Sequence, residues 1–258
     1  MIEIKNLHKS FGPKNVLNGV DLEITPGDTI CIIGKSGCGK SVLLKHIVGL
    51  LEPNMGKVLV DGMEVAKMKA DDIFELRKQI GYVFQSAALF DSMTVYENTI
   101  IGLYEHGERD HEMMEKEAIR VLSAVGLLPD RKEVSGEEFL EEWEILKNKK
   151  PADLSGGMRK RVGVARALVG SPKFVFYDEP TTGLDPVTSE QIDALIEELT
   201  KRMNVTSIVI THDMFSVFKI AKTVAMLDKG KVRFFGTVDE LRKSDDKEVI
   251  EFLERYDN

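Results

Sequence analysis

Hydrophobic residues follow two patterns along the chain, short apolar runs toward both ends and a helical spacing in the middle. The run from Thr29 to Ile33 is almost continuously apolar, which is typical of a strand buried on both faces. Other short runs predict strands at 2–4, 21–24, 57–60 and 80–84, with helices at 39–49 and 71–77. The first part of the chain is therefore expected to be mainly strand.

From Val95 to about Gly170 the pattern becomes helical. Ala118, Val121, Leu122 and Val125, for example, follow the i, i+3, i+4, i+7 spacing of one helix face. Beyond this stretch, strands are predicted at 174–177, 207–211, 224–227 and 232–235, with a helix at 188–202. Because strands alternate with helices, we expect an α/β core with a parallel sheet, formed by 1–94 and 171–258, and a helical subdomain at 95–170.

A charged segment at 129–150 lies within the predicted helical subdomain. It carries the only tryptophan, Trp143, and glutamates at positions 137, 138, 141, 142 and 144. Such a charge run is typical of a flexible or solvated insertion. Two roles are open to it, a solvated helical ornament or a docking surface for another subunit.

Composition limits the classes of protein to which the chain can belong. Its 258 residues, 43% hydrophobic and 30% charged, are enough for one large domain or two unequal lobes. The formal net charge of -8 is opposite in sign to the basic face that contacts phosphates, so no nucleic-acid partner is expected.

No segment predicts membrane crossing or secretion. The best apolar stretch, Val42 to Leu51, is interrupted by a lysine, a histidine and a glycine and is shorter than the roughly 18 to 20 residues of a span. Met1 leads directly into an alternating strand pattern, without the apolar core of a secretory signal. Cys31 and Cys38 resemble neither a disulfide framework nor a zinc site. A cytoplasmic location is expected.

A phosphate-binding sequence, G-x-x-x-x-G-K-[ST], joins the buried strand to the first helix. We expect nucleotide contacts from Gly34, Lys35, Ser36, Gly37, Cys38, Gly39, Lys40, Ser41 and Val42. Glycines let the backbone wrap a phosphate, and the N–H groups at the helix start attract its charge. Lys40 is expected to contact the outer phosphates of ATP, and the Ser41 hydroxyl to bind Mg²⁺. An accessible Cys38 thiol would make the protein sensitive to alkylation, and bound ATP would protect the thiol.

The apolar run that starts at Phe174 ends in two adjacent carboxylates, Asp178 and Glu179. Seen alone, they are most simply the polar end of a strand. A phosphate loop elsewhere in the chain changes this interpretation, because nucleotide hydrolysis needs an acid near Mg²⁺ and a group that orients water. We therefore assign Asp178 to the metal and Glu179 to the water.

A third candidate site is formed by Ser155, Gly156 and Gly157, at the start of a predicted helix. Ser155 could act as a simple helix cap, with the glycines as a turn. Alternatively, two glycines that open a helix form a second anion site. The basic run that follows, Arg159 to Arg161, is interpreted as a solvated helix face rather than a phosphate or lipid-headgroup patch.

Taken together, these motifs resemble those of the ATP-binding subunits of ABC transporters, over essentially the whole chain. The resemblance implies a P-loop NTPase fold, the ABC ATPase core, with a mixed sheet, an N-terminal antiparallel β portion and an α-helical subdomain. It also implies a head-to-tail homodimer in which Ser155, Gly156 and Gly157 complete the ATP site of the opposite subunit. ATP would hold two subunits together, and attack of water on the γ-phosphate would release them.

The resemblance assigns roles to residues that are ambiguous alone. Phe11 matches the aromatic that stacks on adenine, and Gln85 the glutamine that binds Mg²⁺ and senses the transmembrane partner. His212 matches the histidine that contacts the γ-phosphate, while Leu184 and Asp185 match a loop that crosses the dimer interface. In isolation, Phe11 could be a core residue and Gln85 a polar residue at a strand end. His212 could be part of a helix cap beside Asp213, and Leu184 with Asp185 part of a turn that starts a helix.

Glu179, His212 and Lys40 are expected at the C-terminal ends of neighbouring strands, where open parallel sheets bind ligands. The chain departs from the family pattern in three places. Phe11 replaces the usual tyrosine, Met158 stands where many members have glutamine, and the segment at 129–150 is longer than the usual link before the Ser155 motif.

The stretches 37–46 and 154–162, and the ending from Phe235, most resemble the Mce/Mla-type lipid-transport ATPases. This implies movement of lipid, phospholipid above all, through integral membrane permease subunits with an Mce-type substrate-binding protein, from the inner face of the cell membrane. The alternatives are an ABC ATPase for an amino acid or a metal, and a soluble ABC ATPase without a transport role. The segment from Phe84 to Asn98 resembles the version that docks a coupling helix of the membrane subunit, which favours transport.

Overall fold

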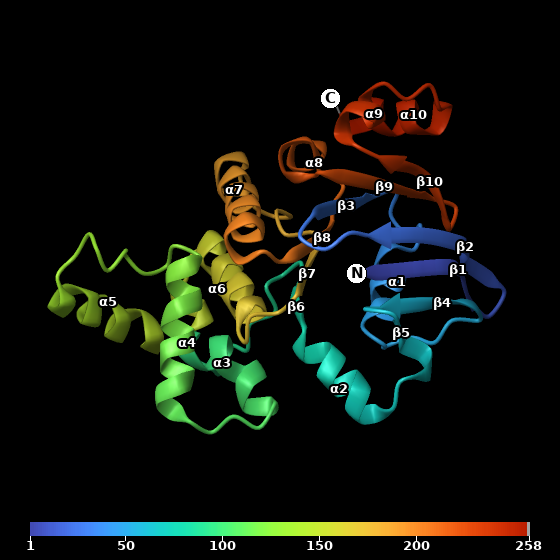
Figure 1. Ribbon diagram of the computed structural model, residues 1–258. Coiled ribbons are helices and arrows are strands. Elements are labelled where there is room, and N and C mark those ends of the chain that lie inside the picture. Colours follow the sequence, from blue (N-terminus) through green and yellow to red (C-terminus); the bar gives the residue numbers. More distant parts are fainter. Residues whose placement is uncertain (257–258) are drawn as a thin grey trace. The chain divides into compact units, whose positions relative to one another are not determined.

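The computed structural model describes residues 1–256 and divides into two compact units (Figure 1). Unit 1 comprises Met1–Arg77 and Ile196–Asn258, and unit 2 comprises Lys78–Leu195. The predicted boundaries of core and helical subdomain, near 94 and 171, stay a prediction.

Strands and helices alternate along most of the chain. The strands are β1 Ile2–Phe11, β2 Lys14–Ile24, β3 Thr29–Ile33, β4 Met55–Val60, β5 Met63–Glu64, β6 Ile80–Val83, β7 Phe174–Asp178, β8 Thr206–Ile210, β9 Thr223–Asp228 and β10 Lys231–Gly236. The helices are α1 Lys40–Ile47, α2 Ala70–Lys78, α3 Val95–Glu105, α4 His111–Ala124, α5 Gly136–Asn148, α6 Gly156–Leu168, α7 Pro186–Met203, α8 Met214–Ile220, α9 Val238–Arg242 and α10 Lys247–Tyr256. Short 3-10 turns lie at Val65–Lys67 and Pro151–Asp153.

Unit 1 contains an antiparallel sheet in the order β2-β1-β4-β5 and a mixed set of strands around β3. β3 pairs in parallel with β8 and with β9, and β10 pairs antiparallel with β9. Every residue of β3 is buried, as its apolar run predicts. The N-terminal antiparallel portion and the mixed sheet are both confirmed.

The N-terminal hairpin is longer than the sequence pattern indicates. The pattern predicts strand only at 2–4 and 21–24, whereas β1 and β2 pair from Ile2 to Phe11. Register shifts after Ile4, Leu7 and Lys9 interrupt the pairing. Each irregularity breaks the two-residue alternation on which the prediction depends, because side chains change face there.

Unit 2 combines the parallel pair β6 and β7 with helices α3 to α6 and the first part of α7. Ala118, Val121, Leu122 and Val125 are fully buried, which confirms the predicted helix face. β6 lies very close to α6, since a Cβ atom added at Gly81 would be 1.9 Å from the Ala167 carbonyl oxygen.

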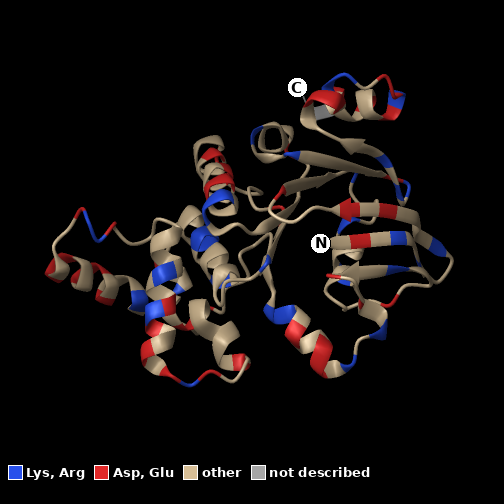
Figure 2. Cartoon of the chain, viewed as in Figure 1, with Lys and Arg blue, Asp and Glu red and all other residues tan. Residues whose placement is uncertain are grey.

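The charged insertion forms a packed helix, α5. Phe139, Trp143 and Leu146 are buried on its inner side, and the Trp143 Nε1 donates to Glu115 Oε1 at 2.8 Å. The Trp143 ring also meets Tyr96 edge-on, with centroids 6.0 Å apart. Figure 2 shows acidic residues along α5, so the insertion has a buried apolar side and a solvated acidic side.

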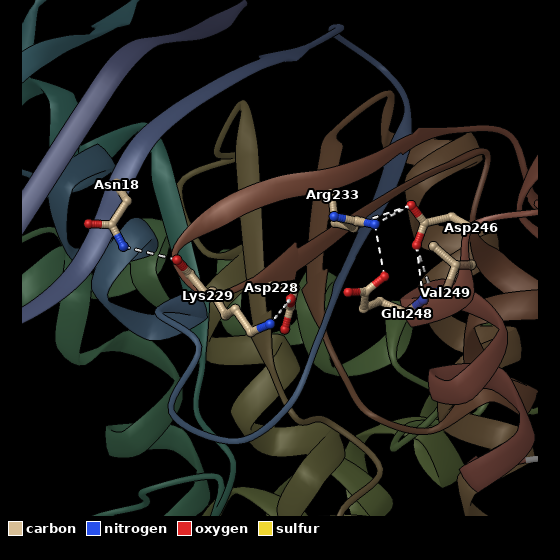
Figure 3. Close-up of polar contacts among 7 residues, drawn as sticks. All are labelled: Asn18, Asp228, Lys229, Arg233, Asp246, Glu248 and Val249. Carbon is tan, nitrogen blue, oxygen red and sulfur yellow. Dashed lines mark hydrogen bonds and ion pairs between the residues drawn. The ribbon is translucent and has the colours of Figure 1, made fainter.

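Within unit 1, the segment that starts α10 is held to β10 (Figure 3). Arg233 Nε donates to Asp246 Oδ2 and its Nη2 to Glu248 Oε2, both at 2.8 Å. Asp246 also accepts hydrogen bonds from the backbone N–H groups of Glu248 and Val249, at the start of α10. The buried Val249 and Phe252 add apolar packing. Exposed ion pairs stabilise little by themselves, so the apolar packing contributes more to holding this segment in place.

Among the helices of residues 1–256, none is both long enough and apolar enough to cross a bilayer.

We expect Gly81→Ala to destabilise unit 2. The added methyl group would overlap the Ala167 carbonyl oxygen, and overpacking of this kind typically costs about 1–3 kcal/mol. Gly102→Ala is the matched control, because its Cβ would meet nothing within 4 Å and alanine favours helix by roughly 0.5–1 kcal/mol. Denaturant unfolding should show opposite shifts in midpoint. Equal midpoints for the two variants would contradict the close contact.

Candidate functional site

The segment from Gly34 to Ser41 turns tightly between β3 and α1. Gly34 and Gly39 have φ angles of 144° and 113°, which glycine adopts far more readily than other residues. A Cβ atom at Gly34 would lie 2.2 Å from the Leu227 carbonyl oxygen. The loop can leave β3 in this direction only because no side chain is present.

Donor groups converge on this loop. α1 begins without a side-chain cap, so the N–H groups of its first turn can bind an anion. Lys40 Nζ donates to the carbonyl oxygens of Gly34 at 2.6 Å and Lys35 at 3.3 Å, which places its ammonium group across the loop. A loop of this kind, with an ammonium group and backbone N–H groups together, suits a phosphate.

Cys38 lies within the same loop and is half-buried. Burial raises the pKa of the Cys38 thiol, although the nearby Lys40 ammonium acts in the opposite direction. The thiol is therefore protonated at neutral pH and is a weak nucleophile.

His212 follows a strand adjacent to the one that carries the phosphate loop. β3 and β8 are parallel, with Ile32 opposite Ile210, so His212 and Gly34 both come after the carboxyl ends of neighbouring strands. Asp213 accepts a hydrogen bond from the Phe215 N–H at 2.9 Å and caps α8. The capping role therefore belongs to Asp213, and the His212 side chain is exposed.

Phe11 lies at the end of β1 with 47% of its surface exposed. Such exposure excludes a role as a core residue. Lys9 Nζ is 5.4 Å from the centroid of the ring, within the range of a cation–π contact. The ring offers a flat surface on which a base can stack.

In unit 2, Asp178 is oriented by a tyrosine. β6 and β7 are parallel, with Val83 opposite Tyr177, so Gln85 and Asp178 lie toward the same edge. Tyr82 Oη donates to Asp178 Oδ2 at 3.1 Å. Burial, together with the Asp178 carboxylate, raises the pKa of Tyr82, so the hydroxyl stays protonated as a donor. A carboxylate held in this way has a fixed orientation, as hydrogen-bonded metal ligands do.

Glu179 has an unusual backbone conformation. Its φ of 53° lies in the left-handed region, at a cost of about 1–2 kcal/mol for a residue with a Cβ atom. Thr182 Oγ1 donates to Glu179 Oε2 at 3.1 Å and fixes the carboxylate. Strained backbone of this kind concentrates at functional sites, so the observation points to Glu179 as a functional residue.

Ser155 caps α6, since its side chain accepts a hydrogen bond from the Met158 N–H at 3.2 Å. The two glycines after it pack against the end of the preceding loop and the first turn of α7. A Cβ at Gly156 would lie 3.7 Å from Leu184 Cδ2, and a Cβ at Gly157 would lie 3.0 Å from Thr188 Cγ2. The structure thus brings the start of α6 beside the segment at 184–188.

Asp185 starts α7. It accepts hydrogen bonds from the backbone N–H and the hydroxyl of Thr188, and these bonds lower the pKa of the Asp185 carboxyl. Asp185 therefore does form the turn that starts α7. It could also lie at a subunit interface, because Asp185 is exposed and Leu184 is only half-buried.

The interpretation of Arg159 to Arg161 as a solvated face is wrong for Lys160. Lys160 is only 6% exposed and donates to the Gln85 carbonyl oxygen. Burial lowers the pKa of Lys160, and the Glu179 carboxylate opposes this shift. Arg161 is half-buried and donates to the Val125 carbonyl oxygen at 2.6 Å. Long basic side chains can bury their stems, which a charge run does not reveal.

The predicted site residues fall into two groups. Unit 1 carries Phe11, Gly34, Lys35, Ser36, Gly37, Cys38, Gly39, Lys40, Ser41, Val42 and His212. Unit 2 carries Gln85, Ser155, Gly156, Gly157, Asp178, Glu179, Leu184 and Asp185. Sequence analysis missed Tyr82, Thr182 and Lys160. Tyr82 and Lys160 act through contacts with distant segments, which no sequence signal marks. Thr182 acts on a carboxylate only three residues earlier in the chain.

Alkylation provides a test of the phosphate loop. We expect iodoacetamide to modify Cys38 more slowly at pH 7 than it modifies free cysteine, and to react faster as pH rises, because burial keeps the thiol protonated. ATP should slow the reaction further. Peptide mass spectrometry locates the modified residue, and Cys38→Ser is the control. Reaction at pH 7 as fast as that of free cysteine would contradict this environment.

Sequence comparison places the chain among known proteins. A profile described as ABC transporter matches residues 17–182. The chain is 36% identical over 252 residues to the probable ribonucleotide transport ATP-binding protein mkl of Mycobacterium leprae, covering 98% of this chain and 68% of that protein. It is 34% identical over 253 residues to the intermembrane phospholipid transport system ATP-binding protein MlaF of Haemophilus influenzae, covering 98% of this chain and 90% of that protein.

The fold also matches solved structures. One is a dimeric ATP-binding cassette in a post-hydrolysis state with bound ADP and Pi, with a TM-score of 0.76 and 31% sequence identity, covering 92% of this chain and 99% of that chain. The family match spans more than half of the chain and includes the phosphate loop, Ser155–Gly157 and the two carboxylates at the end of β7. The chain belongs to the ABC transporter family and is an ATP-binding subunit that hydrolyses ATP.

Proposed function

We propose that this chain powers the movement of phospholipid through partner membrane subunits. The observation that carries the lipid assignment is the match to the phospholipid-transport relative, which extends over 90% of that protein's length. The ribonucleotide-transport relative matches over 68% of its length, so nearly a third of it has no counterpart in the alignment. An Mce-type substrate-binding protein would deliver or receive the lipid.

An apolar pocket in unit 2 supports the proposal that the chain binds a membrane partner. It has a volume of about 450 Å³ and is lined by Phe84, Ala88, Phe90, Ile101, Gly102, Glu105 and Arg166. Phe84 and Phe90 are 45% and 51% exposed. Exposed aromatic rings around a concave surface are typical of a protein interaction site. Phe84, Ala88 and Phe90 of this lining belong to the segment that resembles a permease-docking region, so the chain would bind permease subunits on the inner face of the membrane.

The proposed chemistry assigns each group a role. Lys40 and the N–H groups at the start of α1 bind the β- and γ-phosphates, His212 contacts the γ-phosphate, and Phe11 stacks on adenine. Ser41, Gln85 and Asp178 offer hydroxyl, amide and carboxylate oxygens, the ligands that Mg²⁺ prefers. When bound, Mg²⁺ neutralises charge on the phosphates.

Glu179 is the proposed general base. Its carboxylate is fixed by Thr182 and orients the water that attacks the γ-phosphate in line with the leaving group. Ser155, Gly156 and Gly157 would bind the γ-phosphate of the opposite subunit, and Leu184 with Asp185 would line the interface. A dimeric cassette among the solved structures supports this pairing into a head-to-tail homodimer.

An ABC ATPase for another substrate is the alternative, and the relative named for ribonucleotide transport favours it. An amino acid or a metal, or a role without transport, would leave the ATP chemistry unchanged. The substrate class is therefore tested through the assembled complex.

We expect Glu179→Gln to retain ATP binding and to lose turnover by about 10²–10⁴-fold, because the amide cannot accept a proton. ATP should then trap the variant as a dimer, measured by size-exclusion chromatography with ATP and Mg²⁺. Glu141→Gln, at an exposed position of α5, is the matched control and should hydrolyse ATP normally. Hydrolysis by Glu179→Gln at the wild-type rate would refute the assignment.

We expect the tagged wild-type chain, purified in detergent from its native membranes, to carry integral membrane subunits, and the ATPase activity of this complex to rise with phospholipid vesicles. Phe90→Glu should reduce recovery of these subunits by at least about 10-fold, because it places a carboxylate in the apolar pocket. Phe235→Glu, equally exposed at 50% but on β10, should retain them. Stimulation by ribonucleotides or methionine instead of phospholipid would reject the lipid assignment.

A further inference from the structure

Two cationic side chains of α6 bind one short turn of unit 2, from Gln85 to Ala88. Lys160 Nζ donates to the Gln85 carbonyl oxygen. Arg166 donates through Nη2 to the Ala87 carbonyl oxygen at 2.6 Å and through Nη1 to the Ala88 carbonyl oxygen at 2.8 Å. Hydrogen bonds from charged donors are stronger than neutral ones, and both side chains lose much of their hydration to make them.

The turn has a conformation that these contacts maintain. Ala87 and Ala88 have φ angles of 61° and 46°, so two consecutive residues with Cβ atoms occupy the left-handed region. Such backbone persists only where its surroundings impose it. α6 also makes room for the turn at Gly163, where a Cβ would lie 3.2 Å from the Ala87 Cβ. Arg166 binds the carbonyl oxygens of both alanines, and the Ala87 N–H also donates to the Phe84 carbonyl oxygen at 2.9 Å within the turn.

The contact between α6 and the Gln85–Ala88 turn lies between two regions with different proposed functions. Phe84 and Ala88 line the apolar pocket, as does Arg166 itself. At its other end, α6 begins at the Ser155 cap. Lys160 lies between these two regions of the helix and is under the electrostatic influence of Glu179. One rigid helix thus connects the pocket, the Gln85 turn and the Ser155 motif.

We propose that Lys160 and Arg166 are positioning residues that hold the Gln85–Ala88 turn against α6, so that a partner in the apolar pocket changes the placement of Ser155 and Gly156. This inference rests on the proposed function, in which the pocket binds a permease and Ser155 contacts ATP. The partner acts on the turn, the cationic side chains transmit the displacement to α6, and the helix moves its own N-terminus. Neither side chain needs to touch ATP.

The measured quantity is the ratio of ATPase activity in the membrane-purified complex to that of the isolated chain. Lys160→Met and Arg166→Met keep most of the side-chain length but remove the donors, and each should lower the ratio by about 5-fold or more. Lys160→Arg keeps a charged donor and should retain the wild-type ratio. Hydrogen exchange should report faster exchange of the amides at 85–88 in both methionine variants.

Arg161→Met is the matched control. Arg161 lies on the same helix and donates to a backbone carbonyl, but that carbonyl belongs to Val125 and not to the turn. This variant should lose a similar amount of stability and keep the wild-type ratio. Arg166→Lys, which keeps the charge with fewer donors, should give an intermediate ratio and serves if Arg166→Met does not fold.

Each outcome decides between the possibilities. A lower ratio in Lys160→Met and Arg166→Met, with membrane subunits still recovered with Lys160→Met, supports the inference. An unchanged ratio in these variants overturns it, as does an equal loss in Arg161→Met, because the effect would then be general weakening of α6. A wild-type complex whose ATPase activity equals that of the isolated chain rejects the proposed function itself, so the two failures are distinguishable.

Discussion

The parallel pairing of β3 with β8 and β9 is the constraint on which the phosphate site depends. It buries β3 completely and brings the chain to the sheet edge at Gly34, directly beside the Leu227 carbonyl oxygen. Only glycine fits there, and the loop that follows must turn back into α1. The same pairing places His212 at the corresponding edge. The placement of the phosphate loop and His212 at this edge therefore follows from the strand register.

In unit 2, parallel strand pairing likewise brings polar side chains to one edge of the strands. The parallel pair β6 and β7 directs Gln85 and the carboxylates of Asp178 and Glu179 toward one edge, and Tyr82 and Thr182 orient those carboxylates. Backbone strain at Glu179, Ala87 and Ala88 occurs around these groups. Strain of this size persists where packing and charged hydrogen bonds impose it, and for the two alanines these come largely from α6.

Much of the fold was predictable because its core elements carry strong local patterns. The buried β3 run, the helix face of Ala118 and Val121, and the phosphate loop each depend on residues close together in sequence. The long N-terminal hairpin was underestimated, since register shifts disturb its alternation. The acidic segment around Trp143 was predictable as charged, but its buried inner side required α3 and α4 as packing partners.

The sequence by itself determined the chemistry of this protein. The glycines and Lys40 of the phosphate loop could be predicted from sequence, because such a loop is built from consecutive residues. Only the tertiary structure decided the roles of Tyr82, Lys160 and Arg166. Lys160 stands in a basic run that looks solvated, yet it binds a carbonyl 75 residues away in the chain. Contacts between distant segments depend on how helices pack on strands, and no local pattern encodes them.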